Sequence, residues 1–298
     1  MKALNERKIG ILGRGGAGKS TVTVLLAAML RKLGHEVCVL DGDSTNVGLH
    51  RALGITDPPD PLIEHFGGMV FQGGAVTCPV DDPALIRESD IDLETLDPRF
   101  LRRNADGIAF LQAGKLATFG VGAGCDGPMV KIARDLRVRS GTTPSILIVD
   151  FKAGLEDSFR GALVAMDDVI VVTDPSAAGI SAAVALKESL AAQRAGREPA
   201  TRHLESPSSV ELARRLYRES SLTGIHVVAN KVDDSAVERL MREHLRPHGL
   251  ELTAVIPRCS EIHDAWLWGK PISSLAMSKP VKKLLTHLEQ SADVESLA

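Results

Sequence analysis

The sequence contains few cysteines, and they are widely spaced. The four are Cys38, Cys78, Cys125 and Cys259 in a chain of 298 residues, and no two of them form a C-x-x-C pair. They are too few and too scattered for a disulfide framework in a chain of this length. We therefore expect the protein to work in a reducing compartment, with the cytoplasm as the default location.

Long apolar segments and a strong charge of either sign are also missing. No stretch reaches the roughly 18 uninterrupted apolar residues of a membrane-spanning helix, and no apolar run typical of a signal peptide precedes residue 8. The formal net charge is −3, so we expect no overall attraction to nucleic acid or to an anionic membrane. A local basic patch is compatible with this balance.

What the sequence does contain is a regular alternation of short apolar runs and helical stretches, in a chain that is 44% hydrophobic and 24% charged. The expected strands are 8–12, 36–41, 107–114, 145–150, 168–174, 225–231 and 252–257, and the expected helices are 18–33, 127–137, 175–195, 235–246 and 279–291. Runs that are apolar throughout are typical of strands buried on both faces. The order predicts an α/β fold with a doubly wound, mostly parallel sheet, helices on both faces and ligands at the carboxyl ends of the strands.

Two segments interrupt this rhythm. Residues 54–106 are rich in Pro, Gly and Asp, and residues 194–222 are polar and charged. We interpret the first as an excursion that carries a surface loop or a partner site, and the second as an insertion that leads into a short helix. The chain as a whole, 1–298, is expected to form a single domain.

A phosphate-binding loop follows the first expected strand and opens the first helix. The pattern G-x-x-x-x-G-K-[ST] is satisfied by Gly13, Arg14, Gly15, Gly16, Ala17, Gly18, Lys19, Ser20 and Thr21. The glycines let backbone N–H groups turn toward phosphate oxygens, and the helix N-terminus adds its positive end. Lys19 is expected to reach the β- and γ-phosphates, and Ser20 to offer its hydroxyl to Mg²⁺. A glycine-rich turn without a ligand is the alternative.

Polar residues follow three other strands. Asp43 in "LDGDSTN" and Asp150 in "ILIVDFKAG" could hold the water shell of Mg²⁺ or orient an attacking water, although capping or a turn also explains them. Gly154 would allow the hinge of a phosphate-sensing switch. In "ANKVDD", Asn230 could read a purine edge while the stem of Lys231 packs on the ring, and a turn that starts a helix is the alternative. The N-K-x-D spacing leaves the identity of the base open.

Taken together, "GRGGAGKST", "DGDSTN", "VDFKAG" and "ANKV" resemble the deviant-Walker P-loop ATPases from about residue 8 to 270. This superfamily includes division-site and chromosome-partition ATPases, the nitrogenase iron protein and carbon monoxide dehydrogenase nickel-insertion ATPases. The resemblance implies ATP rather than GTP, Mg²⁺, and slow hydrolysis coupled to a partner by an ATP-dependent homodimer. Asp43 would then orient the attacking water, Asp150 would begin switch II, and Asn230 would contact adenine together with Pro257 and Arg258.

Arg14 departs from the family pattern, in which a lysine at this position contacts the nucleotide of the partner subunit. Arginine keeps the charge and adds a planar fork suited to phosphate, so we expect Arg14 to act in trans as an arginine finger beside the catalytic residues Lys19 and Asp43. An outward-facing, salt-bridging arginine is the alternative. Lys152, two residues after Asp150, could add positive charge from switch II.

A second resemblance concerns "GVGAGCDGPMVKIARDL", residues 120–136, which is similar to the cysteine segment of the iron protein and of the nickel-insertion ATPases. The nickel-insertion ATPases have a Cys-x-Cys pair in this segment. In this sequence, Gly127 stands where that pair has its second cysteine. Two copies of Cys125 in a dimer do not complete a tetrahedral metal site. His65, Cys78, Asp126 or Glu156 could contribute a ligand, and a thiol without metal is the alternative. Cys38 is expected in the core and Cys259 in a structural role.

Three functions are compatible with these motifs. The first is an ATPase switch in metalloenzyme maturation or nickel insertion that acts on a client metalloenzyme or another protein, and it rests on "GAGCDGP" and "DFKAGLED". The second is a partition or positioning ATPase acting on DNA, membrane or cargo, for which the basic and leucine-rich segment 278–291 gives a weak membrane-helix signal. The third is an electron-transfer ATPase like the iron protein, which the missing second cysteine disfavours.

Overall fold

The computed structural model describes residues 4–116, 125–195, 197, 201–273 and 277–295. The strands are β1 Lys8–Leu12, β2 Glu36–Asp41, β3 Asp90–Asp92, β4 Arg102–Arg103, β5 Ala109–Gln112, β6 Arg137–Ser140, β7 Thr143–Asp150, β8 Asp168–Thr173, β9 Gly224–Val232 and β10 Leu252–Pro257. The helices are α1 Lys19–Lys32, α2 Leu49–Ala52, α3 Leu62–His65, α4 Gly127–Asp135, α5 Glu156–Phe159, α6 Ala177–Arg194, α7 Pro207–Arg218, α8 Ser235–Leu245, α9 Ser260–Trp268 and α10 Ser278–Glu295. Short 3₁₀ helices span Val70–Gln72, Pro98–Phe100, Ala162–Ala165 and Arg246–His248.

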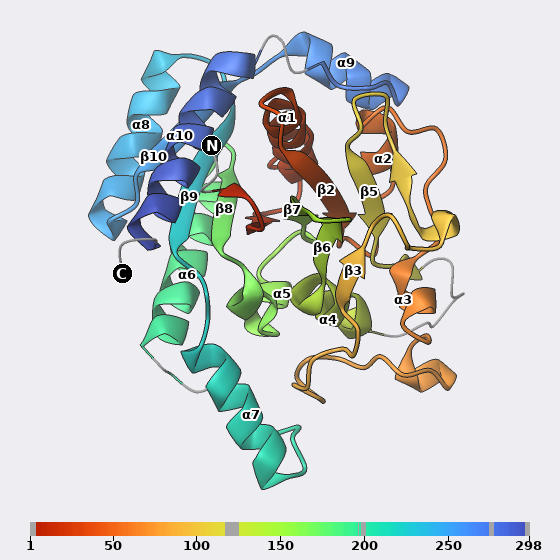
Figure 1. Cartoon of the computed structure of the whole chain (residues 1–298). Coiled ribbons are helices and arrows are strands. Elements are labelled where there is room, and N and C mark those ends of the chain that lie inside the picture. The colour runs from red at the N-terminus through yellow and green to blue at the C-terminus, as the bar shows by residue number, and fades with distance from the viewer. Residues whose placement is uncertain (1–3, 117–124, 196, 198–200, 274–276, 296–298) are drawn as a thin grey trace.

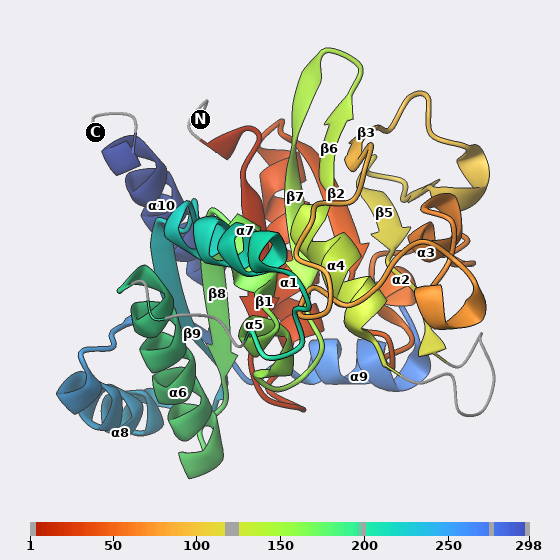
Figure 2. The same cartoon turned by 90° about the horizontal axis from the view of Figure 1, so that it is seen from below.

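The strands form one sheet in the order β10-β9-β8-β1-β7-β2-β5-β4. All pairs along this order are parallel except β4 with β5. β6 pairs antiparallel with the start of β7 and parallel with β3, and Figure 2 shows β6 and β7 as a ribbon that extends past the rest of the sheet. The expected parallel sheet is confirmed, and β3, β4 and β6 are additions that the sequence pattern did not predict.

Both faces of the sheet are buried, as the apolar strands predicted. Val37 and Val39 of β2 belong to a core cluster shared with α1 and α10, whereas the intervening Cys38 and Leu40 belong to a cluster shared with α4, α6 and α8. Adjacent side chains of a strand point to opposite faces, so each strand serves two helical layers (Figure 1). The expectation that Cys38 is a core residue is confirmed, since its side chain is fully buried.

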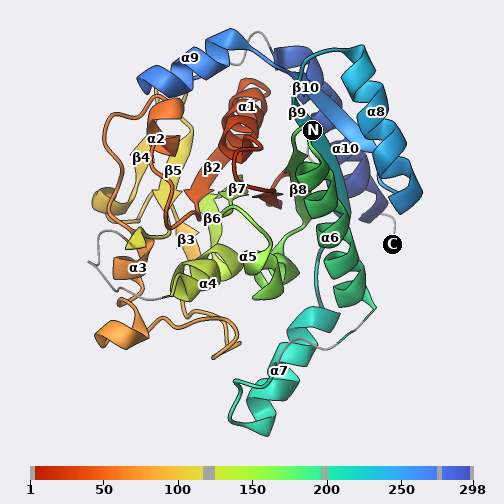
Figure 3. The same cartoon turned by 180° about the vertical axis from the view of Figure 1, so that it is seen from behind.

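The two irregular segments lie at the margins of this sheet. Residues 54–106 contain α3, β3 and β4, and residues 194–222 contain α7. Figure 3 shows α7 beyond the end of α6, away from the strands. The N-terminus of α7 is fixed by Ser206, whose hydroxyl accepts a hydrogen bond from the backbone N–H of Ser209.

The C-terminal helix α10 packs into the core rather than presenting an apolar face to solvent. Leu284, Leu285 and Leu288 are at most 3% exposed, and they join the cluster that contains α1. The leucines that gave the weak membrane-helix signal are therefore packed in the protein core. Within the described part of the chain, no helix has both the length and the apolar character required to cross a membrane.

Candidate nucleotide site

The loop from Gly13 to Thr21 joins β1 to α1 and lies directly against β8 and β9. Gly13 and Gly18 have φ angles of 146° and 94°, which residues with a side chain rarely adopt. A Cβ atom on Gly13 would overlap the carbonyl oxygen of Val172, and one on Gly18 would overlap the side-chain amide of Asn230. The loop therefore requires glycine at both positions.

Lys19 is a buried cation at the start of α1. Its Nζ atom donates a 3.5 Å hydrogen bond to the carbonyl oxygen of Arg14, so the side chain folds back over the loop. Burial lowers the pKa of Lys19, while the charges of Asp150, Asp43 and Asp157 act in the opposite direction. Lys19 can attract an anionic ligand, but the three carboxylates oppose one, so a phosphate bound here would need a divalent cation to offset their charge.

Ser20 and Asp150 meet at the carboxyl ends of β1 and β7. The pairing register sets Asp150 level with Ile11 of β1 and Asp41 of β2, and the Ser20 hydroxyl donates a 2.6 Å hydrogen bond to Asp150 Oδ2. The other carboxylate oxygen, Oδ1, is buried without a partner. Burial raises the pKa of Asp150 to about 7, and the nearby charges of Asp41 and Asp43 add to this effect.

This pair fits a magnesium ion. Mg²⁺ prefers hard oxygen ligands and is commonly held by one or two protein oxygens together with water and phosphate. A divalent cation would occupy the unpartnered lone pairs of Asp150 Oδ1 and offset the cost of burying its charge. The Ser20 hydroxyl and the Asp150 carboxylate are therefore the residues that would hold Mg²⁺ here.

Asp43 lies in the turn that follows β2. Its Oδ1 atom accepts hydrogen bonds from the backbone N–H groups of Thr45 and Asn46, at 2.9 and 3.1 Å, and from the Thr45 hydroxyl. The Asn46 side chain in turn donates to the Ser20 hydroxyl at 3.4 Å. The turn role considered for Asp43 is therefore present, and the same turn brings its carboxylate to the phosphate loop.

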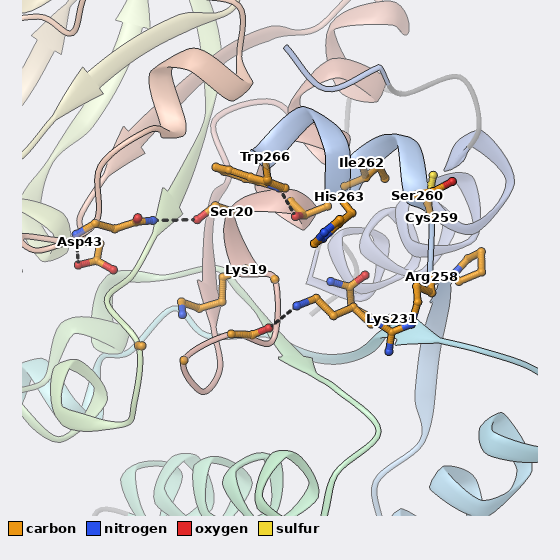
Figure 4. A pocket seen from close by; sticks show the side chains of 18 of the residues that line it. Lys19, Ser20, Asp43, Lys231, Arg258, Cys259, Ser260, Ile262, His263 and Trp266 are labelled. Atoms are coloured by element: carbon orange, nitrogen blue, oxygen red, sulfur yellow. Dashed lines mark hydrogen bonds between the residues drawn. The ribbon is translucent and has the colours of Figure 1, made fainter. Parts of the chain in front are cut away.

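Lys19, Ser20 and Asp43 line one pocket of about 1190 Å³. Figure 4 shows Lys19, Ser20 and Asp43 toward one end of it, Lys231 and Arg258 toward the other, and α9 along the upper side. Gly15, Gly16, Gly18, Lys19, Ser20, Thr21, Asp43, Asn230, Lys231, Pro257 and Arg258 are the predicted residues among its lining. Gly13, Ala17 and Asp150 do not line it, and the latter two are buried beside it.

At the end of the pocket near Lys231, side chains form hydrogen bonds with the phosphate loop and with one another. Asn230 is 4% exposed, and its amide donates a 2.9 Å hydrogen bond to the carbonyl oxygen of Ala17. Lys231 has a φ angle of 61° and donates to the carbonyl oxygen of Gly16 at 2.7 Å. Asp233 pairs with Arg258 at 2.6 Å. The side chains of Asn230 and Lys231 therefore hydrogen-bond to the phosphate loop, and the Asp233 carboxylate is paired with Arg258.

Sequence reasoning missed the contribution of α9. Trp266 lines the pocket, and its indole N–H donates a 2.8 Å hydrogen bond to the Thr21 hydroxyl. Ile262, His263 and Cys259 line the same wall. The amphipathic run at 260–268 carried no signal for this role, because the contact joins residues more than two hundred positions apart.

Arg14 forms an ion pair within its own chain. Its guanidinium donates to both oxygens of Asp174, at 3.2 and 3.3 Å, just after β8. The arginine side chain is 38% exposed, so this pair contributes little stability on its own. Asp174 holds Arg14 at the surface of the phosphate loop, where a second molecule can reach it.

A second polar cluster joins the start of α4 to the segment after β7. Asp126 accepts hydrogen bonds from Lys152, at 2.7 Å, and from Arg160, and the Ser44 hydroxyl donates to it at 3.3 Å. Burial acts to raise the pKa of Asp126, but the two cationic partners hold it below its usual value. Gly154 N–H donates to the Gly13 carbonyl at 3.1 Å, so this segment also contacts the phosphate loop.

The candidate metal ligands near Cys125 are dispersed. His65 packs edge-on against Phe66 and Phe100, and the Glu156 carboxylate lies 3.9 Å from Arg160. Cys125 is exposed. Over the described ranges, no group of three or more His, Cys, Asp or Glu side chains is placed to hold a metal ion. The described residues of one copy therefore do not form a complete transition-metal site at Cys125.

Asp157 carries a deeply buried carboxylate near the phosphate loop. It is 3% exposed, and neither of its side-chain oxygens has a hydrogen-bond partner. Burial raises its pKa to about 7, and the charge of Asp126 adds to the effect. Asp157 is thus held, without partners, within the electrostatic reach of Lys19.

This burial predicts a pH-dependent stability. Between an unfolded pKa near 4 and a folded pKa of about 7, the native state binds more protons, so its free energy of unfolding falls as pH rises through this window. We expect Asp157→Asn to stabilise the nucleotide-free protein by roughly 2–4 kcal/mol at pH 8, and to have little effect at pH 4. Urea unfolding at the two pH values measures the difference.

Exposed Asp106 provides the matched control. Asp106→Asn is expected to leave the pH dependence of unfolding unchanged. Equal effects of Asp157→Asn at pH 4 and pH 8 would show that Asp157 does not titrate in this window.

Comparison with known proteins agrees with this geometry. The model of the CobQ/CobB/MinD/ParA nucleotide binding domain matches residues 11–272. An uncharacterised ATP-binding protein of Methanocaldococcus jannaschii is 30% identical over 284 residues, which cover 94% of this chain and 99% of that protein. The carbon monoxide dehydrogenase accessory protein CooC of Rhodospirillum rubrum is 28% identical over 188 residues, covering 60% of this chain and 67% of that protein.

A solved structure gives the same result for the fold. The septum site-determining protein MinD of Pyrococcus horikoshii, complexed with Mg-ADP, superposes with a TM-score of 0.60 and 20% identity, over 97% of this chain and 98% of that one. At this identity the likeness shows a shared fold, a mostly parallel open sheet flanked by helices.

Proposed function

The chain belongs to the CobQ/CobB/MinD/ParA family of nucleotide-binding P-loop ATPases, and from this premise we propose that it is a Mg²⁺-dependent ATP hydrolase that switches by forming a homodimer. One observation carries the proposal. Lys19, the Ser20–Asp150 pair and Asp43 converge on one glycine-rich loop from the ends of three strands. The arrangement combines phosphate binding, a magnesium site and a carboxylate for water.

Each residue has a distinct part in the reaction, in which water cleaves the terminal phosphoryl group to give ADP and phosphate. Lys19 and the loop N–H groups bind the phosphates and offset the charge that develops on them. Asp43 orients the attacking water and accepts its hydrogen bond. The metal, held at Ser20 and Asp150, supplies charge neutralisation when bound.

Arg14 completes the site in trans in this proposal. Its pair with Asp174 is weak because it is partly exposed, so a nucleotide phosphate of the partner copy can replace Asp174 as the acceptor. The planar guanidinium binds phosphate through paired hydrogen bonds. Dimerisation and hydrolysis are thereby coupled. Lys152 is paired with Asp126, so it acts on the nucleotide site through this ion pair and not as a free cation.

We assign ATP as the nucleotide. The relative from Methanocaldococcus jannaschii that is 30% identical is an ATP-binding protein, and a guanine base would have to displace Arg258 from the Asp233 carboxylate, to which it donates a 2.6 Å hydrogen bond. The pocket wall beside it is formed by Pro257, Ile262 and the ring of Trp266, which suits a purine face with few polar contacts.

Nucleotide binding is expected to change tryptophan fluorescence. Trp266 is a pocket residue bonded to Thr21, whereas Trp268 is 70% exposed at the end of α9, and they are the two tryptophans of the chain. We expect ATP with Mg²⁺ to change the emission, Trp268→Phe to retain most of this change, and Trp266→Phe to remove it.

A parallel titration with GTP measures which nucleotide base the pocket prefers. GTP is expected to need at least about a tenfold higher concentration than ATP for the same change, a difference of about 1.4 kcal/mol. Equal responses to the two nucleotides, or a preference for GTP, would contradict the assignment. A signal that resides in Trp268 instead would place the nucleotide outside this pocket.

The biological role that we propose is metalloenzyme maturation, with a client metalloenzyme as partner. It is supported by the similarity to CooC over 188 residues and by the segment 120–136, in which Cys125 precedes α4. The link between Asp126 and the segment after β7 gives a route from the nucleotide to this cysteine.

A further inference from the structure

A second pocket, of about 270 Å³, lies between α2 and α9. It is lined by residues of two segments, 47–52 and 265–270, and both Figure 1 and Figure 3 show α9 beside α2. The backbone N–H of Ile272 donates a 3.0 Å hydrogen bond to the carbonyl oxygen of Ala52, which fixes the chain after α9 to the end of α2. The two walls of the pocket are therefore joined.

The helix α9 carries apolar side chains on two of its faces. Ile262, Ala265 and Trp266 recur at helical spacing and pack against the core cluster that contains α1. Leu267 and Trp268 follow directly, and successive residues of a helix point about 100° apart. These two side chains are 66% and 70% exposed, so the second apolar face of α9 is open to solvent.

The exposed apolar side chains gather at this pocket together with positive charge. Eight large apolar side chains are exposed in the described part of the chain, and Val47, Leu267 and Trp268 are the three that line the pocket. Its charged lining residues are Arg51 and Lys270, both exposed, and none of the described lining residues is acidic. We call these five residues the α9 patch. Contiguous exposed apolar groups of this kind mark interaction sites.

Both walls of the pocket contact the phosphate loop. Trp266 lines this pocket as well as the nucleotide pocket, and its indole N–H donates to the Thr21 hydroxyl. On the other wall, the Asn46 side chain donates to the Ser20 hydroxyl at 3.4 Å, and Val47 is the next residue. A molecule seated on the α9 patch would therefore press on two groups that hold the nucleotide site.

We propose that the α9 patch docks an acidic segment of a partner protein, which inserts one apolar side chain into the pocket, and that this docking and nucleotide binding change each other's affinity. The effect is reciprocal, because a coupling free energy between two sites acts equally in both directions. Docking to the nucleotide-free chain does not depend on the proposed function. Only its dependence on nucleotide does.

The shape and charge of the α9 patch favour this occupant. The pocket is smaller than the roughly 300–1,000 Å³ of small-molecule sites, but it accommodates a single apolar anchor of the kind that dominates protein interfaces. The cations Arg51 and Lys270 complement carboxylates beside that anchor. A helix that lies in a membrane interface buries its apolar face in lipid, whereas α9 packs Ile262, Ala265 and Trp266 against its own core.

The test uses the full chain and a display library of random twelve-residue peptides. We expect the selected peptides to be acidic and to carry Leu, Phe or Trp between carboxylates. Fluorescence anisotropy of one labelled selected peptide then measures its affinity for each variant. Trp268→Ala should weaken binding at least about tenfold, as the loss of an aromatic anchor does. Arg51→Glu should also weaken it, by a factor that shrinks at high salt because exposed charges are screened.

Matched controls come from α8, which has an exposed leucine and an exposed arginine outside both pockets. Leu240→Ala and Arg239→Glu should bind the peptide as the unaltered chain does. The Trp266 fluorescence response to ATP verifies in each of these variants that the fold and the nucleotide site are intact.

The dependence on nucleotide is measured with the same labelled peptide. Saturating ATP with Mg²⁺ should change its affinity at least about fivefold, the lower end of typical coupling between sites. Trp266→Phe keeps an aromatic ring but loses the N–H that bonds to Thr21. It should still bind the peptide, with a much smaller effect of nucleotide.

Several results would overturn the inference. Selected peptides without acidic residues would do so, as would peptides whose binding is unaffected by Trp268→Ala. Binding to phosphatidylserine vesicles that Trp268→Ala abolishes would assign the α9 patch to a membrane, and self-association abolished by the same substitution would assign it to a second copy of the chain. Equal peptide affinity with and without bound ATP would disprove the coupling. Failure of the chain to bind ATP would instead contradict the proposed function, so the two failures are distinguishable.

Discussion

Replacing Lys19 with alanine is expected to lower ATP turnover per chain by at least about a hundredfold. Lys19 is buried beside the phosphate loop and faces the carboxylates of Asp150, Asp43 and Asp157. Removing one preorganised charge from a site of this kind typically costs a factor of about 100–1000 in rate. Steady-state phosphate release at saturating ATP measures the effect, and the apparent affinity for ATP should fall as well.

Exposed Lys32, at the far end of α1, gives the matched control. Lys32→Ala removes the same charge from the same helix and should leave turnover within about twofold, as expected for a surface charge outside the site. Turnover by Lys19→Ala above one tenth of the unaltered rate would mean that phosphate charge is stabilised by another cation.

Arg14→Ala is expected to reduce turnover on the order of a thousandfold while leaving ATP binding by a single chain nearly unchanged. An arginine supplied in trans to a transferring phosphoryl group contributes at least this much to rate. In the free chain Arg14 contacts Asp174 rather than the pocket, so its removal does not alter the resting nucleotide site. The Trp266 titration and phosphate release separate the two effects.

Mixing two inactive variants tests the trans role. In a mixed dimer, a Lys19→Ala chain still supplies Arg14 to the nucleotide held by an Arg14→Ala chain, so the mixture should exceed the summed rates of its components. Asp174→Ala, which removes only the resting partner, should keep or raise the unaltered rate. A mixture without added activity, or an Asp174→Ala chain as slow as Arg14→Ala, would assign Arg14 a role within its own chain.

The features that the sequence predicted well are those encoded by neighbouring residues. The phosphate loop lies between β1 and α1 because its glycines, the preceding apolar strand and the following helix are contiguous. Asp43 and Asp150 lie beside it because parallel strands bring their carboxyl ends to one edge. Adjacency in the sheet was enough to predict that Asp43 lines the pocket and that Asp150 lies beside it.

The features that the sequence could not predict depend on packing between distant segments. Trp266 contacts Thr21 across 245 positions, and Cys78 reaches Gly127 from a loop without regular periodicity. The burial of Asp157 without partners follows from the fold around it rather than from its neighbours in sequence. For Asn230, an expected base contact, the structure adds a bond to the loop carbonyl of Ala17 that no motif specifies.

In the proposed function, two copies of this chain build one hydrolytic unit. Phosphate release per chain, measured over a range of protein concentrations with the mass in solution determined at each point, tests this directly. We predict that turnover per chain rises with concentration and levels off as the mass with ATP and Mg²⁺ doubles from the 31.8 kDa of one chain. A constant turnover per chain by a species that keeps the mass of a monomer would contradict the proposed homodimer.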